Sequence, residues 1–288
     1  MTNGVLLFAN NNEQVDYVKQ AVWSSYRIKK HLGCKVAIAT DSPDYLENFY
    51  GKHLNVVDHI IPVDYHSTQT KQHKRYRDGT MSEKSLTWKN TNRVTAYDIT
   101  PFDQTIVMDT DVIINNSMYN NCWNQPEDLL IDKSPIDLHQ ARNDPTFDRI
   151  SDKSIDFYWA TAFFFRKSPF TKLFFDTINH VVENYDFYRM MYQIIPQKLR
   201  NDFVFSIAIH ILNGFGPADI WPKPMPGKMF MMTDCDILHQ VDNDRYTMLL
   251  DKVTHPGQYY VNSVSGVNMH VMNKFSLGRI IDKEFADE

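Results

Sequence analysis

Short apolar runs alternate with segments of helical apolar spacing along residues 1–115, and this alternation constrains the fold most. Strands and helices that alternate in this way form a mainly parallel sheet with helices on its faces. The sequence therefore predicts an α/β fold. The expected strands are residues 4–9, 35–40, 56–61 and 105–108, and the expected helices are residues 15–32, 44–50 and 85–97.

The second half of the chain is less regular. Residues 157–165 are an apolar run that predicts a buried strand, and Ser168-Pro169 is a typical start for the helix that follows. A second helix is expected over residues 203–212, and a loop over residues 214–226, which carry two Gly and four Pro. No repeat or linker divides the chain, so we expect one domain over residues 1–288.

The triplet Asp109-Thr110-Asp111 directly follows the apolar strand over residues 105–108. In extended or tightly turned backbone, residues i and i+2 point to the same side, so both carboxylates aim at one point beyond the strand. Two negative charges at such a short distance favour a cation between them. Oxygen ligands suit Mg²⁺ or Mn²⁺ held jointly with phosphates, as in a nucleotide diphosphate. The same triplet also occurs where an aspartate only caps a turn.

Polar residues follow three of the predicted strands. These residues are Asn10, Asp41 and Asp109, which are far apart in sequence. Parallel sheets bind ligands beyond the carboxyl ends of their strands, so the three side chains should gather along one rim. Residues 10–12 also offer a cap for the first helix.

The charge distribution bears on partners. The net charge is −5, from 30 basic and 35 acidic residues, which argues against a nucleic-acid-binding domain as a whole. Residues 71–77 nevertheless carry four positive charges and no acid, and Lys84, Lys89 and Arg93 follow. This segment is either a solvated loop or a basic wall facing the phosphates of a nucleotide or of DNA.

The strand–helix–strand start, the Asp109-Thr110-Asp111 strand end and the late segment 266–274 together resemble GT-A-fold glycosyltransferases. The residues around 88–115 also resemble glycosyltransferase-like proteins of tailed phages. The resemblance implies a GT-A-like, Rossmann-type, mainly parallel sheet flanked by helices. Residues 1–115 would form the nucleotide-sugar half, and residues 116–288 a smaller acceptor-side half that ends in a metal and phosphate segment.

The resemblance also implies roles for the charged residues. Asp109, Asp111 and His270 would bind Mn²⁺ or Mg²⁺, although a lone His in an apolar segment is also common as a core residue. Lys274, four residues after His270, would neutralise the leaving diphosphate. Lys89 and Arg93, one helical turn apart, would face the same phosphates, or simply be solvated on the helix.

Residues for the nucleoside and the acceptor follow from the same resemblance. Asn10, Tyr17 and Asp41 match positions that contact base and ribose, although Asn10 and Asp41 also suit capping. Residues 159–162 correspond to the strand that lines the sugar site, but lack the Asn-x-Gly form of one retaining family. Asp202 resembles the acid that faces sugar or acceptor and would serve as base in an inverting reaction; it would equally suit a helix N-cap.

The expected function is a metal-dependent hexosyl- or pentosyltransferase that uses a nucleotide sugar, with a UDP-sugar favoured. The acceptor would be a hydroxyl group, with a hydroxymethylated cytosine in phage DNA slightly preferred over a glycan or a protein. A non-catalytic nucleotide-sugar-binding module is the alternative. A haloacid-dehalogenase-type phosphatase would need Thr or Val where Ile113 stands, and a nucleotidyltransferase would need a Gly-rich loop, whereas residues 8–12 contain no Gly.

The sequence also bears on location. No apolar stretch approaches the ~18–20 residues of a membrane span, and the start lacks the basic and apolar regions of a signal peptide. The three cysteines, Cys34, Cys122 and Cys235, are isolated and lack metal-site spacing. We therefore expect a cytoplasmic protein, in the host cytoplasm if phage-encoded, with no membrane partner.

Overall fold

A computed structural model describes the chain except residues 65–69, 76–82, 89–91, 134, 141, 143–147, 152–153, 196–198, 218–220, 253, 256 and 287–288. The side chains of residues 70–75, 83–88 and 92 also lie outside the description. Among the described residues, no helix combines the length and apolar character that crossing a bilayer requires.

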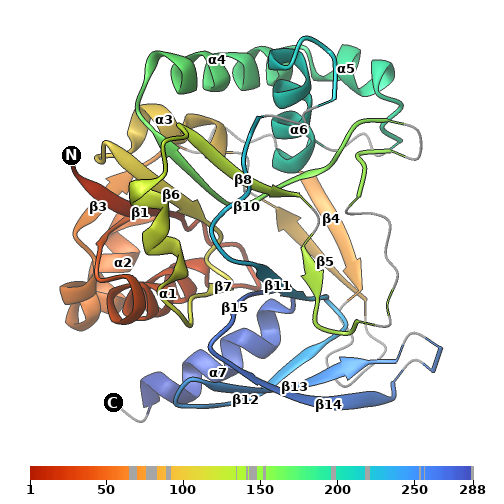
Figure 1. Cartoon of the computed structure of the whole chain (residues 1–288). Helices are drawn as coiled ribbons and strands as arrows, with labels where there is room; N and C mark the ends of the chain where they lie inside the picture. Colours follow the sequence, from red (N-terminus) through yellow and green to blue (C-terminus); the bar gives the residue numbers. More distant parts are fainter. Residues whose placement is uncertain are drawn as a thin grey trace.

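The largest described sheet has six strands in the order β3-β2-β1-β6-β10-β8 (Figure 1). The first four of these are mutually parallel, β10 is antiparallel to β6, and β8 is antiparallel to β10. The prediction of a mainly parallel α/β sheet flanked by helices is therefore confirmed. The strands are β1 (Asn3–Phe8), β2 (Lys35–Thr40), β3 (His59–Pro62), β6 (Gln104–Met108), β10 (Tyr158–Arg166) and β8 (Leu129–Lys133).

The central strands are apolar along most of their length because both faces of the sheet are covered. Val5, Leu6 and Leu7 of β1 are fully buried. Gly4 is required for a close approach, since a Cβ atom there would lie 2.3 Å from the ring of Phe102. Local packing therefore requires glycine in a strand that otherwise favours large apolar residues.

Helix α1 (Tyr17–Leu32) follows β1 and ends as predicted, with Gly33 in the left-handed conformation at φ 64°. Its N-cap differs from the prediction: Asp16, not residues 10–12, accepts a hydrogen bond from the Lys19 amide. Helix α2 (Pro43–Tyr50) and a 3₁₀ turn, η1 (Gly51–Val56), connect β2 to β3.

Helices α4 (Pro169–Glu183), α5 (Tyr185–Met191) and α6 (Asn201–Leu212) lie together, away from α1 and α2 (Figure 1). Ser168 and Thr171 cap α4 reciprocally, as the Ser-Pro start predicts. The ring of Phe205 on α6 lies 4.9 Å from that of Phe163 on β10 and 5.6 Å from that of Phe174 on α4. These aromatic contacts attach α4 and α6 to the sheet.

Two further sheets complete the second half of the chain. One has the order β7-β15-β11-β9, and the other is an antiparallel meander of β12, β13 and β14 (Figure 1). Helix α7 (Lys274–Ala286) packs on β12. The strands are β7 (Val112–Ile113), β15 (Asn268–Val271), β11 (Met229–Met232), β9 (Ile136–Asp137), β12 (Ile237–Asp242), β13 (Arg245–Asp251) and β14 (Tyr259–Ser265).

The helix predicted over residues 85–97 is wrong in its first part, whereas residues 92–97 are helical. Residues 83–88 form strand β5 (Glu83–Trp88), which pairs with β4 (Thr70–Arg75), so residues 71–75 of the basic segment are strand and not loop. Residues such as Thr87 and Trp88 have high strand propensity, and an antiparallel partner supplies the hydrogen bonds that a helix would have made. The 3₁₀ turn η2 (Asn92–Thr95) and short helix α3 (Ala96–Ile99) follow, and another 3₁₀ turn, η3 (Met118–Asn124), precedes β8.

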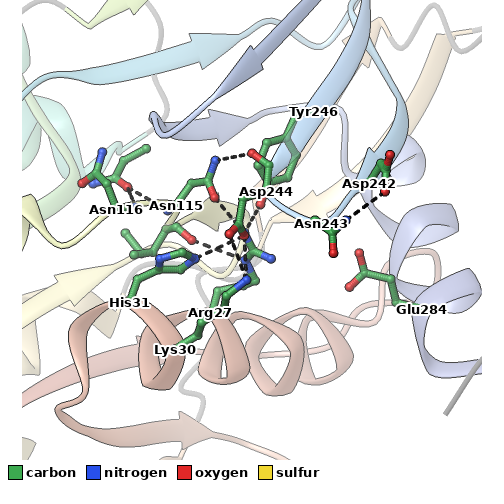
Figure 2. A network of polar contacts seen from close by, with 12 residues as sticks. Arg27, Lys30, His31, Asn115, Asn116, Asp242, Asn243, Asp244, Tyr246 and Glu284 are labelled. Carbon is green, nitrogen blue, oxygen red and sulfur yellow. Dashed lines mark hydrogen bonds and ion pairs between the residues drawn. The ribbon is translucent and has the colours of Figure 1, made fainter.

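A polar network centred on Arg27 joins α1 to the turn between β12 and β13 (Figure 2). The Arg27 guanidinium donates to Asn115 Oδ1 and Asp244 Oδ1, both at 2.9 Å, and to the Tyr246 hydroxyl. Lys30 Nζ also contacts Asp244 at 2.9 Å. This network fixes the three-stranded sheet against the first helix.

Candidate functional site

The turn between β6 and β7 carries both aspartates and is held from three sides. The Asp109 amide donates to the Thr161 carbonyl at 2.9 Å, and the Val112 amide donates to the Asp109 carbonyl at 3.2 Å. The Ser24 hydroxyl of α1 donates to the Thr110 carbonyl at 2.8 Å. The backbone is therefore fixed, and both carboxylates point to the same region beyond β6, as the i, i+2 spacing predicts.

His270 reaches this region through strand pairing. β15 pairs antiparallel with β7, which places His270 opposite Val112, and the Val271 amide donates to the Asp111 carbonyl at 2.9 Å. Asp109, Asp111 and His270 each offer a ligand atom, and these atoms lie within 4.8 Å of one another. Three residues predicted as metal ligands are thus brought together by the meeting of two sheets.

Two cationic side chains contact the aspartates. Lys274, the first residue of α7, places Nζ on Asp111 Oδ2, and Arg93 of η2 pairs with Asp109 Oδ1. His270 Nε2 lies 3.2 Å from Asp111 Oδ2. The side chains of Asp111 and Arg93 are only 3% and 4% exposed, so these charges interact in a site with little water.

The electrostatics keep the site ionised. Burial alone would raise the pKa of Asp111, but His270 and Lys274 hold it well below its usual range. Burial lowers the pKa of Arg93 to about 10, and the nearby Asp202 and Asp111 carboxylates oppose that shift. At neutral pH, Asp111 is therefore a carboxylate and Arg93 a cation.

The donor set fits a divalent cation. Two carboxylates and an imidazole suit Mn²⁺, which accepts oxygen and nitrogen ligands, better than Mg²⁺, which is held mainly by oxygen. His270 Nδ1 is buried and makes no hydrogen bond within the described part of the chain. A buried polar atom without a partner is costly in a closed structural cluster, whereas a binding site retains such atoms for a ligand.

Asp202 lies inside the first turn of α6, so the alternative that it caps this helix is wrong; the N-cap is Arg200. Asp202 Oδ1 accepts a hydrogen bond from the Ala160 amide at 3.0 Å, and Oδ2 accepts one from Arg200 Nη2 at 2.8 Å. The Ala160 carbonyl accepts from Arg93 Nη1 at 2.5 Å. Ala160 therefore links Asp202 to the Arg93–Asp109 pair across the edge of the sheet.

The three residues predicted for the nucleoside also lie near this edge. Asn10 follows β1 and Asp41 follows β2; Asn10 Oδ1 accepts from the Asp41 amide at 3.1 Å, which ties the two strand ends together. Tyr17 opens α1, and its ring centroid lies 5.9 Å from Lys274 Nζ. Burial raises the pKa of Tyr17, so its hydroxyl is neutral.

Of Lys89 and Arg93, the two residues predicted to face the phosphates, the structure describes only Arg93. Lys89 lies outside the described residues, as do the side chains of residues 71–77. Arg93 lies not on an α-helix, as predicted, but in the 3₁₀ turn η2, where it is buried against Asp109 and the Ala160 carbonyl. It therefore pairs directly with one of the two aspartates.

Sequence reasoning missed the residues that support the aspartate turn. Gln20 and Ser24 of α1 are both buried, and Gln20 Oε1 accepts a hydrogen bond from the Thr110 hydroxyl at 3.3 Å. Two polar residues four apart on the buried face of a helix were the available signal, since such residues need partners. The Trp159 ring also packs against His270, with centroids 5.3 Å apart.

No protein-family model and no curated protein matches the chain. Among solved structures, it is similar to the galactosyltransferase LgtC in complex with donor and acceptor sugar analogues, at 12% identity and a TM-score of 0.40, over 72% of this chain and 70% of LgtC. It is also similar to the glycosyltransferase GlyE from Streptococcus pneumoniae, at 10% identity and a TM-score of 0.39, over 74% of this chain but only 43% of GlyE.

A third similar structure is a 4-diphosphocytidyl-2C-methyl-D-erythritol synthase from Anaerococcus prevotii, at 10% identity and a TM-score of 0.35, over 74% of this chain and 82% of that one. All three TM-scores lie below 0.5. The geometry of the site must therefore carry the functional conclusion.

Proposed function

We propose that this chain is a metal-dependent glycosyltransferase that moves a sugar from a nucleotide diphosphate sugar to a hydroxyl group. The observation that carries the proposal is the convergence of Asp109, Asp111 and His270 beyond the carboxyl ends of the parallel strands. Ligands of parallel α/β sheets bind at this edge. Arg93 and Lys274 lie against the same carboxylates.

The charge balance of the cluster suits a diphosphate. The two carboxylates are balanced by Lys274 and Arg93, so a divalent cation bound there adds a double positive charge that nothing else in the cluster neutralises. A diphosphate group supplies the matching negative charge. This complementarity supports a nucleotide diphosphate as the donor's leaving group.

In the proposed reaction, the bond between the anomeric carbon and the diphosphate oxygen breaks, and that oxygen keeps the electron pair. The acceptor oxygen forms the new bond to the anomeric carbon and releases its proton. When bound, the divalent cation supplies Lewis-acid stabilisation of the departing diphosphate. Lys274 donates hydrogen bonds to the same oxygens, where negative charge develops.

Asp202 is the proposed base for the acceptor proton in an inverting reaction. Its two described hydrogen bonds use one lone-pair direction on each oxygen, and a carboxylate has about four. The remaining directions can accept a hydroxyl proton. Its link through Ala160 to Arg93 places it at the same edge as the metal ligands.

For the donor, we propose a UDP-sugar, with Asn10, Asp41 and Tyr17 near the nucleoside. Their positions at the ends of β1 and β2 and at the start of α1 support this role. Mn²⁺ is the proposed ion, with Mg²⁺ as the alternative. The three free cysteines fit a reducing cytoplasm.

The DNA acceptor hypothesis, a hydroxymethylated cytosine in phage DNA, rests on the basic segment 71–77, whose side chains lie outside the described residues. A Lys74→Ala, Arg75→Ala, Arg77→Ala variant tests it by titration with duplex DNA at fixed salt. Loss of DNA binding with donor hydrolysis intact would support a DNA acceptor, and unchanged DNA affinity would refute the DNA acceptor hypothesis.

The two alternative functions, a phosphatase and a non-catalytic binding module, make different demands on the residues of the site. A haloacid-dehalogenase-type phosphatase would need Thr or Val at position 113, where this chain has Ile113, fully buried in β7 opposite Met269. A non-catalytic nucleotide-sugar-binding module would bind donor and metal in the same place without turnover.

The deciding experiment is a nucleotide-sugar screen with Mn²⁺ that scores release of nucleoside diphosphate. We expect one donor to be turned over by the wild type, and Asp111→Ala to lose on the order of 10²-fold or more in rate. Asp282→Ala, an exposed aspartate on α7, is the matched control and should keep full activity. A thermal shift with a donor but no release of nucleoside diphosphate would favour the binding module. If no donor gave either a thermal shift or release, both the glycosyltransferase and the binding module would be refuted.

A further inference from the structure

A cavity of about 290 Å³ lies between the start of β10, helix α6 and the loop that follows α6. Its buried wall includes Tyr158, Ser206 and Ile209. The volume is at the small end of ligand pockets, which range over roughly 300–1,000 Å³, so it suits a ligand of one or two rings. None of the roles proposed above uses these residues.

The cavity lies beside Asp202. The Ser206 hydroxyl donates to the Asp202 carbonyl at 2.7 Å, and the Tyr158 amide donates to Ser206 Oγ at 2.8 Å. One turn earlier on α6, Asp202 makes the corresponding contact with Ala160. Ser206, which lines the cavity, therefore lies about one helical turn, or ~5.4 Å along the helix axis, from Asp202.

Phe215, at the edge of this cavity, has an unusual backbone conformation and an unusual exposure. Its φ of 61° is in the left-handed region, which bulky residues rarely adopt, and its side chain is 55% exposed. Its amide donates to the His210 carbonyl at 2.9 Å, and its ring lies 5.7 Å from the His210 ring at 85°. The bond to His210 closes the end of α6, and the exposed ring at the cavity edge offers an apolar face on which a ligand can pack.

The polar lining carries few charges. Its charged members among the described residues are Arg149 and Asp156, and Asp156 is already paired with Lys133 at 2.5 Å. Burial lowers the pKa of His210, so its imidazole is neutral at pH 7. The Ser154 hydroxyl, which belongs to another lining residue, is buried and makes no hydrogen bond to the described residues. Such a lining favours hydroxyl groups over phosphates.

We propose that this cavity binds a glycan unit of the acceptor, with one sugar ring packed on Phe215 and its hydroxyls bonded by Ser154 and His210. The inference rests on the glycosyltransferase function proposed above and names its acceptor class. A cavity with an aromatic edge and one described cation, Arg149, fits an uncharged, hydroxyl-rich ligand better than a nucleic-acid backbone, which needs several cationic partners.

The test is binding of the metal-loaded protein to an array of immobilised mono- to tetrasaccharides, followed by titration of the strongest glycan. Phe215→Gly removes the ring and leaves a residue that suits the backbone. Gly216→Trp fills the cavity, and a Cβ atom there would approach nothing closer than 3.4 Å. Phe187→Ala removes a comparably exposed ring, 60% exposed, from α5 and is the matched control.

We expect Phe215→Gly and Gly216→Trp to weaken glycan binding about tenfold, as for an aromatic residue at the centre of an interface, while Phe187→Ala binds as the wild type does. Donor hydrolysis without acceptor should be unchanged in all three variants. The proposal would be overturned if all variants bound the glycan equally. It would also be overturned if the protein bound duplex DNA but none of the glycans. Glycan binding without any donor turnover would support the cavity and refute the glycosyltransferase function.

Discussion

Two buried arginines in this molecule pair with aspartates, and their surroundings differ. Arg27 is 8% exposed and donates to a set of acceptors from several elements, which it satisfies together with Lys30 (Figure 2). Arg93 is 3% exposed and pairs with Asp109, which converges with Asp111 and His270. Each cluster contains a buried imidazole nitrogen without a hydrogen bond to the described residues, His31 Nε2 in the first and His270 Nδ1 in the second, but only the second gathers two carboxylates at its imidazole.

The comparison shows that burial of a charge does not by itself mark a functional site. In the Arg27 cluster two cations, Arg27 and Lys30, share the single carboxylate of Asp244, and the cluster holds α1 to the β12–β13 turn. In the Asp109–Asp111 cluster two carboxylates, each paired with a cation, converge with an imidazole so that three ligand atoms lie within 4.8 Å of one another. Convergence of metal-ligand atoms is the feature that distinguishes the site.

The largest expected effect comes from replacing one lysine in each cluster and comparing the turnover of the two variants. Lys274→Met removes the cation on Asp111, and we expect turnover of the nucleotide sugar to fall on the order of 10²-fold at saturating Mn²⁺, because the leaving diphosphate loses a donor. Lys30→Met, at the half-exposed end of the Arg27 cluster, should leave turnover within about twofold. Equal losses in the two variants would remove the distinction between the clusters.

The second expected effect is on stability and not on turnover. Arg27→Met leaves Asn115 Oδ1 and the Tyr246 hydroxyl without their donor, which should cost about 2 kcal/mol and lower Tm by roughly 4–8 °C in a chain of this size. Turnover by the folded protein should be unchanged, as measured below the new transition. A loss of turnover at full helicity in circular dichroism would mean that the network also positions the site.

The smallest effect concerns pH. Burial and then Arg27 lower the pKa of His31, with Asp244 opposing them, so the unfolded chain takes up a proton that the folded chain resists. This arrangement costs nothing above about pH 6.5 and reduces stability as pH falls below it, by at most ~1.4 kcal/mol per pH unit. His31→Gln should therefore flatten the fall in Tm between pH 7 and 5.5. An unchanged slope would show that His31 does not cause it.

Local pattern was sufficient for the parallel strands and the aspartate turn. Residues 4–9 and 105–108 are apolar because both faces of the sheet are covered, and the exit of β6 then determines where Asp109 and Asp111 point. The helix over residues 85–97 failed for the complementary reason. Pairing of β5 with β4 decides that segment, and a partner strand leaves no trace in the local periodicity.

The cavity beside Asp202 was not visible in the sequence at all. The described residues of 214–226 form no helix or extended strand, as expected, but the left-handed conformation of Phe215 and its approach to His210 depend on how α6 ends. His210 itself reads as one polar residue in an apolar helix. Only tertiary structure brings these residues together with Ser206 and Tyr158.

The pairing of β7 with β15 also orders events during biosynthesis. Lys274 is separated from Asp111 by 163 positions, and His270 enters the site on the same late strand. At ~5–20 residues per second, a ribosome completes β6 roughly ten to thirty seconds before it delivers these partners. The two carboxylates are thus made well before His270, and the set of three proposed ligands is complete only once the late strand has left the ribosome. An ion held by all three residues would therefore bind after this strand has been made.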